Sequence, residues 1–462
     1  MRKTRLISII FSALPALLLQ GCRNYLNVQP QGYVIPATDE EFASIMHGHL
    51  QDIEGGGDDL IVGNMEVIAR LEGCADDLDA NIKVGELKAY AGELFNVRMT
   101  DYCELYEVIR DCNIVIENLD GRTSRKAADV LSCAYAVKGI CYLNLIRDFC
   151  EPWEEGRAGS QLGVPIVEKF DINARPPRAT LEESVAYCGK LLRRSLELEM
   201  SDKLFIFTEY VTKAYLARLL FWSEQWDACA GLCEDILLNS GLQLCGLEDF
   251  AETIQAANDC KGEVLIRSHI NNASELDWYF SYIRGYIASR PASYALVSLF
   301  GDEPSKDVRW EVSFNEKRCN NKTPECRVRL SEMLLMLAEC YCHQGHTDKA
   351  LEQLNLLRRS RIADVVDYTE ATLPPVRSGE RIVEDARGRA LTPLLQAIFD
   401  ERRRELYMEG DRWYELKRNG RPEWWIINNG LKYTTEKYMY TAPIYKGDVD
   451  LDANMIQNEG YR

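Results

Sequence analysis

Long segments after residue 100 repeat apolar residues every three or four positions, which is the period of an amphipathic α-helix. The first such helix is predicted over residues 102–116, where Tyr102, Leu105 and Ile109 share one face. The same spacing predicts further helices at residues 130–149, 180–198, 210–223 and 227–237. The hydrophobic pattern therefore predicts an all-α protein.

Two of the predicted helix pairs resemble each other in the spacing of their small residues. Twelve positions separate Ala217 from Cys229, and the same interval separates Ala338 from Ala350. Small residues at such positions let two helices pack closely, as in a tetratricopeptide-like pair. Because such pairs cannot bury their apolar faces alone, we expect them to stack into a tetratricopeptide-like helical superhelix.

Two segments interrupt the helical pattern, at residues 52–100 and 243–327. They are richer in glycine, asparagine, proline and aromatic residues, and their apolar runs are short. We interpret them as irregular, loop-rich insertions in the helical scaffold. Binding residues commonly lie on such loops, because a rigid scaffold positions them.

The composition is that of a globular protein, with 46% apolar and 27% charged residues. The 462 residues exceed what one compact core usually organises, so two lobes or an extended helical architecture are expected. The chain has 54 Lys and Arg residues against 72 Asp and Glu residues, a formal net charge of −18. So acidic a surface repels phosphate backbones, which argues against a nucleic-acid partner.

The N-terminus has the features of an export signal. Basic residues occupy positions 2, 3 and 5, and residues 6–19 are mostly apolar but too short to span a bilayer permanently. The sequence Leu19-Gln20-Gly21-Cys22 resembles a bacterial lipobox. We therefore predict a signal peptide over residues 1–21 and a lipid anchor on Cys22, with the rest of the chain outside the bilayer.

Sixteen cysteines raise the questions of disulfides and metals. Most of them lie inside apolar helical patterns, where they are typical of small buried residues. The best disulfide candidate joins Cys319 to Cys326 across a polar turn, and the sequence leaves this pairing open.

A group of four donors, Cys340, Cys342, His343 and His346, suggests zinc. However, Cys340 lies on the apolar side of a helix that Gly345 ends, and no second donor pair follows at finger spacing. We predict no metal and no cofactor.

Glu401, Glu405 and Glu409 are spaced one helical turn apart, which invites comparison with the paired carboxylates of glycosidases. Residues 402–404 are all arginine, and arginines lower carboxylate pKa values, whereas a general acid needs a raised pKa. We therefore interpret these glutamates as part of an ion-pair network. Nucleotide-binding, nucleophile-elbow and His-Glu-x-x-His motifs are absent from the sequence, so the chain is not expected to be an enzyme.

Glycan binding needs flat aromatic faces for sugar C–H surfaces and polar groups for hydroxyls. The aromatic stretch at residues 276–286 lies in the second insertion and provides such faces. The first insertion provides acidic and amide side chains within residues 74–81, a composition that also suits calcium although the full spaced loop is missing. The candidate ligand-binding residues are Trp278, Tyr279, Tyr282, Asp79 and Asn81.

Several segments, in order along the chain, match the motifs of one known family. They are Cys22 with Tyr25-Leu26-Asn27, Tyr106 with Ile109 and Asn113, Asp307-Val308-Arg309, residues 329–361, Glu401–Arg418 and Pro443–Tyr461. Each motif is weakly specific, but the ordered set covers nearly the whole mature chain. On these motifs the protein resembles the SusD/RagB outer-membrane lipoproteins.

The resemblance implies a lipid-anchored, surface-exposed protein of the outer membrane. It would capture an oligosaccharide and deliver it to a SusC-type TonB-dependent transporter. The implied organisation is an N-terminal helical region over residues 22–240 and a C-terminal region with a ligand-loop insertion over residues 241–462. The open alternatives are a RagB-like member that captures a peptide or glycopeptide, a helical-repeat scaffold without a small ligand, and a lipid-anchored hydrolase.

Overall fold

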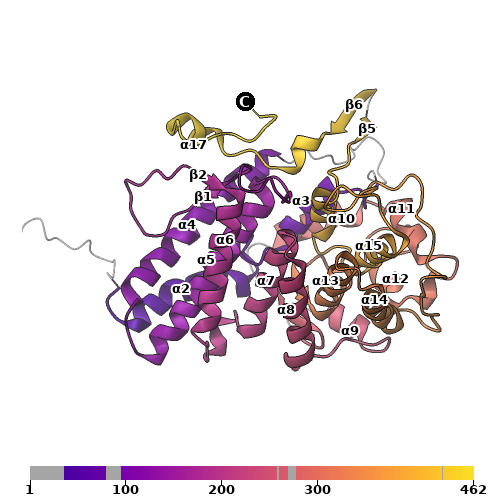
Figure 1. Cartoon of the computed structure of the whole chain (residues 1–462), viewed down its shortest axis with the longest axis horizontal. Helices are drawn as coiled ribbons and strands as arrows, with labels where there is room; N and C mark the ends of the chain where they lie inside the picture. Colours follow the sequence, from indigo (N-terminus) through magenta and orange to yellow (C-terminus); the bar gives the residue numbers. More distant parts are fainter. Residues whose placement is uncertain (1–35, 80–94, 257–259, 269–276, 429, 462) are drawn as a thin grey trace, which may run out of the picture.

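The computed structural model describes residues 36–79, 95–256, 260–268, 277–428 and 430–461, and most of its regular structure is helical (Figure 1). The longer helices of the first half are α2 (Asp39–Gly55), α3 (Met65–Cys74), α4 (Phe95–Leu119), α5 (Arg125–Phe149), α6 (Leu181–Glu197), α7 (Glu209–Trp222) and α8 (Trp226–Asn239). The second half contains α9 (Phe250–Gln255), α10 (Asp277–Ala288), α11 (Tyr294–Val297), α12 (Val308–Ser313), α13 (Leu330–His343), α14 (Thr347–Arg361), α15 (Pro393–Glu405), α16 (Asp411–Arg418) and α17 (Lys446–Leu451).

Successive helices pack on one another in a row. Helix α4 packs on α5, α5 on α6, α6 on α7 and α7 on α8. The row continues from α8 to α13, and α13 packs in turn on α14 and α15. Figure 1 shows this row running across the molecule from the N-terminal to the C-terminal helices. The arrangement confirms the predicted all-α, tetratricopeptide-like scaffold.

The helix boundaries follow from local signals in the sequence. Helix α6 begins after Thr180, whose hydroxyl accepts from the backbone N–H of Glu183 while the Glu183 carboxylate accepts from the backbone N–H of Thr180. Such a capping box satisfies two donors that the first turn leaves unpaired. The observed bounds of α6, α7 and α8 lie within two residues of the predicted ones.

The small residues of the repeated pairs lie where two helices approach closely. The Cys229 thiol on α8 donates to the carbonyl oxygen of Ala217 on α7 at 3.5 Å. Ala338 and Ala350 are both fully buried between α13 and α14. Between α5 and α6, a side chain at Gly139 would meet the Leu192 side chain at 2.7 Å. Close helix packing thus explains why these positions hold small residues.

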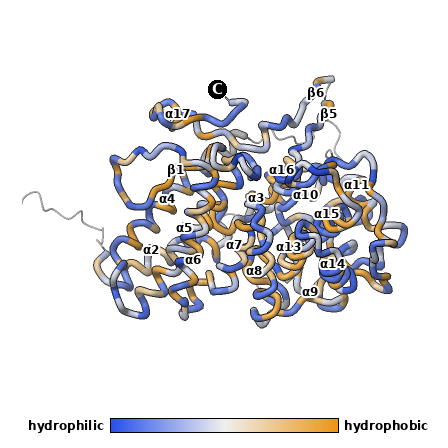
Figure 2. The backbone as a smooth tube through the Cα atoms, viewed as in Figure 1, coloured by the Kyte–Doolittle hydropathy of each residue, from blue (hydrophilic) through white to orange (hydrophobic). Residues whose placement is uncertain are grey.

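The main core lies along the row of helices. Helix α5 supplies much of it, and of the described helices it is the one long and apolar enough to cross a bilayer, yet 89% of that stretch is buried within the protein. Core helices of this kind have the same composition as membrane spans. Figure 2 shows hydrophobic and hydrophilic stretches alternating along the helices, as expected for elements with one buried face.

Short elements connect and cover the row. Three antiparallel two-stranded sheets join β1 (Leu162–Pro165) to β2 (Arg178–Thr180), β3 (Val264–Arg267) to β4 (Arg327–Arg329), and β5 (Trp424–Asn428) to β6 (Leu431–Thr435). The C-terminal segment with β5, β6 and α17 lies along one side of the molecule (Figure 1).

The aromatic stretch in the second insertion forms helix α10 and is not an irregular loop. Its Ile283 and Ile287, one turn apart, are buried with Met65 and Ile68 of α3 in a separate apolar cluster. This contact with α3 provides the tertiary packing that a helix as short as α10 needs. The expectation of a loop at residues 277–288 was therefore wrong.

Candidate functional site

Of the predicted aromatic residues, Tyr282 on α10 has a described side chain, and it lies at the surface. Because Ile283 and Ile287 of α10 face inward, Tyr282 projects outward and is 68% exposed. Trp278 and Tyr279 belong to the first turn of α10, but their side chains lie outside the described residues. Asn81 and the predicted anchor Cys22 also lie outside the described part of the chain.

Asp79 follows α3 in a segment that is joined to two others by backbone hydrogen bonds. The Asp79 N–H donates to the carbonyl oxygen of Pro291 at 2.7 Å, and the Ser293 N–H donates to that of Asp77 at 2.7 Å. In turn, the Ala292 N–H donates to the carbonyl oxygen of Arg318 at 2.7 Å. Residues 77–79, 291–293 and 318–319 thus lie side by side, although they are far apart in the sequence.

These three segments bring a carboxylate, a guanidinium group and an exposed ring together. Arg318 Nη1 lies 3.3 Å from Asp79 Oδ2, and the Arg318 guanidinium lies 3.8 Å from the ring centroid of Tyr294. Tyr294, the first residue of α11, is 72% exposed. We refer to Asp79, Tyr294 and Arg318 as the Tyr294 cluster.

The backbone of Arg318 adopts a conformation that is uncommon for a residue other than glycine. Its φ angle is +64°, in the left-handed region that non-glycine residues rarely adopt. The turn is held by Asn315, whose side-chain oxygen accepts from the N–H of Cys319 at 3.1 Å and whose carbonyl accepts from the N–H of Arg318 at 2.9 Å. Strained backbone of this kind concentrates at functional sites.

A buried ion pair supports the segment that carries Asp79. Arg403 of α15 contacts Asp77 with an Nη2–Oδ1 distance of 2.5 Å, and both side chains are almost fully buried. Asp76 similarly faces Arg412 of α16 at 2.7 Å. Since each described aspartate of residues 74–79 faces an arginine, these carboxylates are engaged in ion pairs and not gathered around a common cation position. The ion pairs of Asp76 and Asp77 with α15 and α16 thus hold the segment in place, and Asp79 at its end is partly exposed.

Tyr294 and Arg318 were not among the predicted site residues. Tyr294 is one of many aromatic residues in the second insertion, and its spacing from Tyr282 follows no helical or strand period. Arg318 contacts Asp79 across 239 positions of sequence. No local sequence pattern predicts such a contact. Tyr294 could have been included among the candidates, because it is an aromatic residue in the insertion that was expected to bind the ligand.

The glutamates of α15 form the predicted ion-pair network. Glu405 accepts from the three buried arginines Arg309, Arg329 and Arg361 at 2.7–3.2 Å. Burial alone would raise the pKa of Glu405, but these arginines outweigh it and hold the pKa well below the ordinary value.

The other two glutamates follow the same pattern. Glu401 lies 2.7 Å from Arg309, and Glu409 contacts Lys322 at 2.6 Å and Arg329 at 2.9 Å. Burial would raise the pKa of Glu409, but Arg329 and Lys322 lower it to about 2. None of the three carboxylates has the raised pKa of a general acid, so the interpretation as an ion-pair network is confirmed.

The cysteines of the described residues are free thiols, fifteen in all. The proposed disulfide between Cys319 and Cys326 was therefore wrong. Cys319 pairs in a β-bridge with Pro291, whereas the Cys326 sulfur points at the carbonyl oxygen of Asn64 at 3.7 Å. The two residues flank a turn, but they belong to different packing environments.

The four donors around Cys340 do not converge. His343 stacks on Trp226 with ring centroids 4.3 Å apart, and Cys340 is fully buried. Among the described residues, the one group that brings three carboxylate, thiol or imidazole ligand atoms within 4.8 Å of one another is Asp59, Asp101 and Glu104.

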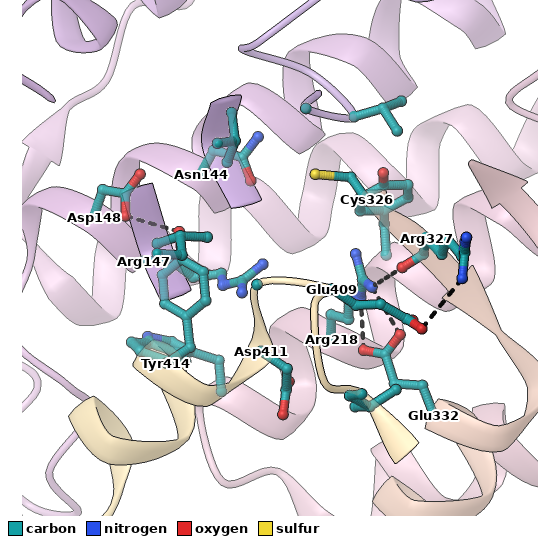
Figure 3. A pocket seen from close by; sticks show the side chains of 18 of the residues that line it. Asn144, Arg147, Asp148, Arg218, Cys326, Arg327, Glu332, Glu409, Asp411 and Tyr414 are labelled. Atoms are coloured by element: carbon teal, nitrogen blue, oxygen red, sulfur yellow. Dashed lines mark hydrogen bonds and ion pairs between the residues drawn. The ribbon is translucent and has the colours of Figure 1, made fainter. Parts of the chain in front are cut away.

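A separate cavity of about 120 Å³ lies between α3, α5, α7, α13, α15 and α16. Figure 3 shows charged side chains pointing into it from several helices. The Tyr414 hydroxyl donates to Asp148 at 2.8 Å, and the Arg147 guanidinium lies 3.6 Å from the centroid of the same ring. Arg218 forms an ion pair with Glu332 at 2.7 Å.

Comparison with known proteins identifies relatives of this fold. The SusD family profile matches residues 308–461. No curated protein matches the chain in sequence. Among solved structures, a SusD superfamily protein of Bacteroides thetaiotaomicron is 19% identical, with a TM-score of 0.70 over 91% of this chain and 99% of that one.

Two further solved structures have the same fold. A SusD-like carbohydrate binding protein of Bacteroides vulgatus is 17% identical, with a TM-score of 0.66 over 91% of this chain and 98% of that one. A SusD superfamily protein of Bacteroides fragilis is 17% identical, with a TM-score of 0.68 over 91% of this chain and 100% of that one. At these identities the likeness establishes the fold alone.

Proposed function

We propose that the chain is a non-enzymatic binding protein of the SusD/RagB family, whose profile matches residues 308–461, and that it binds an oligosaccharide at the Tyr294 cluster. The single observation that carries this proposal is the highly exposed Tyr294 ring held beside the Arg318–Asp79 pair. One of the structural neighbours is a carbohydrate binding protein, which supports a sugar as the ligand class.

The chemistry of the cluster suits a sugar ring. An aromatic face contacts the C–H surface of a pyranose, and a guanidinium and a carboxylate can donate to and accept from neighbouring hydroxyls. Tyr282 on α10 offers a second exposed ring, and Trp278 and Tyr279 of the same helix stay proposed ligand-binding residues from the sequence. Because the Arg318 guanidinium already contacts Asp79 and the Tyr294 ring, little ordering of these side chains would be needed on binding.

The proposed location of the protein is the outer membrane. Acylation of Cys22 would hold the chain at the outer membrane, exposed at the cell surface. There it would pass its oligosaccharide to a SusC-type TonB-dependent transporter. The regions 22–240 and 241–462 remain a predicted division of the mature chain.

A peptide or glycopeptide is the second candidate ligand, since the family includes RagB-type proteins and aromatic rings also bind peptides. The acidic Asp79 beside Arg318 favours hydroxyl recognition, because the pair offers both an acceptor and donors within one ring width. An extended peptide would instead require unpaired backbone edges or a row of apolar pockets.

A binding screen tests the proposal. The soluble mature chain would be applied to a glycan array and a peptide array, and each hit would be measured by calorimetry. Tyr294→Ala should weaken binding of the glycan hit about 5- to 140-fold, if a sugar stacks on the ring as strongly as a nucleic-acid base does, at roughly 1–3 kcal/mol. The matched control is Tyr445→Ala, a tyrosine that is 46% exposed on a different part of the surface. Peptide hits without glycan hits, or equal losses in both variants, would count against the proposal.

A further inference from the structure

The walls of the central cavity contain buried hydrogen-bond donors that no described residue satisfies. They include Trp222 Nε1 on α7 and Arg402 Nη1 on α15. Both residues are about 95% buried, with 5% of their surface exposed. An unsatisfied buried donor destabilises the folded state by roughly 1–3 kcal/mol, unless a bound molecule accepts its hydrogen bond.

A third donor group in the same cavity belongs to Arg147 of α5. Its guanidinium lies against the ring of Tyr414, and no carboxylate of the described residues forms an ion pair with it. Figure 3 shows this guanidinium pointing from α5 toward the middle of the cavity. Arg147 is only partly buried.

Most of the carboxylates that line the cavity already form ion pairs with arginine side chains. The pairs are Asp101 with Arg70 at 2.9 Å, Glu332 with Arg218 at 2.7 Å and Asp411 with Arg402 at 2.5 Å. Asp148 accepts from the Tyr414 hydroxyl, and Asp59 is half-buried beside Asp101. Glu415 has one unsatisfied oxygen, but burial raises its pKa to about 7, so part of its population is neutral at pH 7.

We propose that this cavity is a second ligand site, which binds a small molecule bearing a carboxylate or phosphate oxyanion. The unsatisfied groups of its walls are mainly donors, and an oxyanion is the ligand that accepts from several donors at once. Arg147 supplies a positive charge that forms no ion pair with a carboxylate of the described residues, and Trp222 and Arg402 supply buried N–H groups. The site is separate from the Tyr294 cluster and does not depend on the proposed glycan binding.

The size of the cavity limits the ligand. A water molecule needs roughly 10–15 Å³ of such space, so about 120 Å³ holds roughly eight waters or one molecule of similar bulk. That corresponds to a single sugar acid or a smaller anion, and excludes an oligosaccharide. A cluster of ordered waters is the competing occupant, because waters also satisfy buried donors.

The experiment measures thermal stability and calorimetric binding of the soluble mature chain with glucuronate, acetate, inorganic phosphate and, as the neutral control, acetamide at matched ionic strength. The expected result is a raised Tm and saturable binding with at least one oxyanion and none with acetamide. Arg147→Met keeps an unbranched side chain but removes the charge, and it should weaken binding at least 10-fold. Trp222→Phe removes one N–H and serves as the second variant.

Two controls distinguish the cavity from other places where an anion could bind. Tyr294→Ala should leave the oxyanion affinity unchanged, because Tyr294 does not line the cavity. Loss of glycan binding without loss of oxyanion binding would therefore count against the glycan site alone, and the reverse result would count against the cavity alone. Near-UV circular dichroism establishes that each variant is folded. Absence of any oxyanion effect means that water alone fills the cavity and overturns the proposal. An effect that persists unchanged in both Arg147→Met and Trp222→Phe marks an adventitious ion only and also overturns it.

Discussion

Replacing Glu405 by glutamine tests whether the carboxylates of α15 hold the fold together. The substitution keeps the shape of the side chain and removes its charge. Glu405 is fully buried, and it accepts from Arg309, Arg329 and Arg361, which are themselves at most 1% exposed. Three guanidinium groups from α12, β4 and α14 therefore lose a shared counter-ion inside the protein.

The expected loss follows from the burial of these charges. Removing one partner of a buried ion pair costs about 3–5 kcal/mol, because the remaining charge stays desolvated. Glu263, Glu401 and Glu409 still neutralise part of the charge, so the lower half of that range is expected. Against a total stability of about 5–15 kcal/mol, this is a large fraction. Urea unfolding followed by far-UV circular dichroism at pH 7 measures it.

The matched control is Glu209→Gln. Glu209 forms an ion pair with Lys213 at 2.5 Å on the surface of α7, and its side chain is 59% exposed. Exposed pairs contribute about 0–1 kcal/mol, so this variant should unfold almost like the parent chain. If Glu405→Gln proves no more destabilising than Glu209→Gln, the network does not stabilise the fold and the reasoning is wrong.

Three further predictions concern pH, thiols and the anchor. Burial and the nearby Asp77 raise the pKa of Glu72 from 4.5 to about 8, so between these values the folded protein holds a proton that the unfolded chain has lost, and stability falls as the pH rises. Glu72→Gln should remove about 4 kcal/mol of this fall between pH 5 and pH 8.5, measured by urea unfolding at the two pH values, and an unchanged pH dependence would contradict the assignment. Dithiothreitol should leave the Tm unchanged, because the fifteen described cysteines are free; a clear drop would reveal a disulfide. Cys22→Ala should move the protein from the membrane fraction to the soluble fraction, and continued membrane retention would refute the lipid anchor.

The scaffold could be predicted because its signals are local. Helical periodicity, the Thr180 cap and the small residues Ala217 and Cys229 each act within one helix or one helix pair. The ion-pair network was also accessible, since Glu405 and its neighbouring arginines lie on one helix. The sequence did not show which distant arginines complete the network. These arginines lie on β4 and α14, which reach Glu405 only through tertiary packing.

The candidate site was harder to predict for the same reason. The sequence pointed to Asp79 and Tyr282, and the structure brings Asp79 to Arg318 across a long separation. The density of aromatic residues at 276–286 suggested a loop, although Ile283 and Ile287 already had helical spacing. Whether short apolar runs form a helix depends on a partner surface, here α3, which no local pattern specifies.

The most direct measurement of the central claim is a crystal structure of the chain with the oligosaccharide that binds most tightly in the array screen. The account predicts an intact sugar chain with one ring stacked on Tyr294 and hydroxyls hydrogen-bonded to Arg318 and Asp79. A sugar bound elsewhere on the surface, with the Tyr294 ring left uncovered, would contradict it.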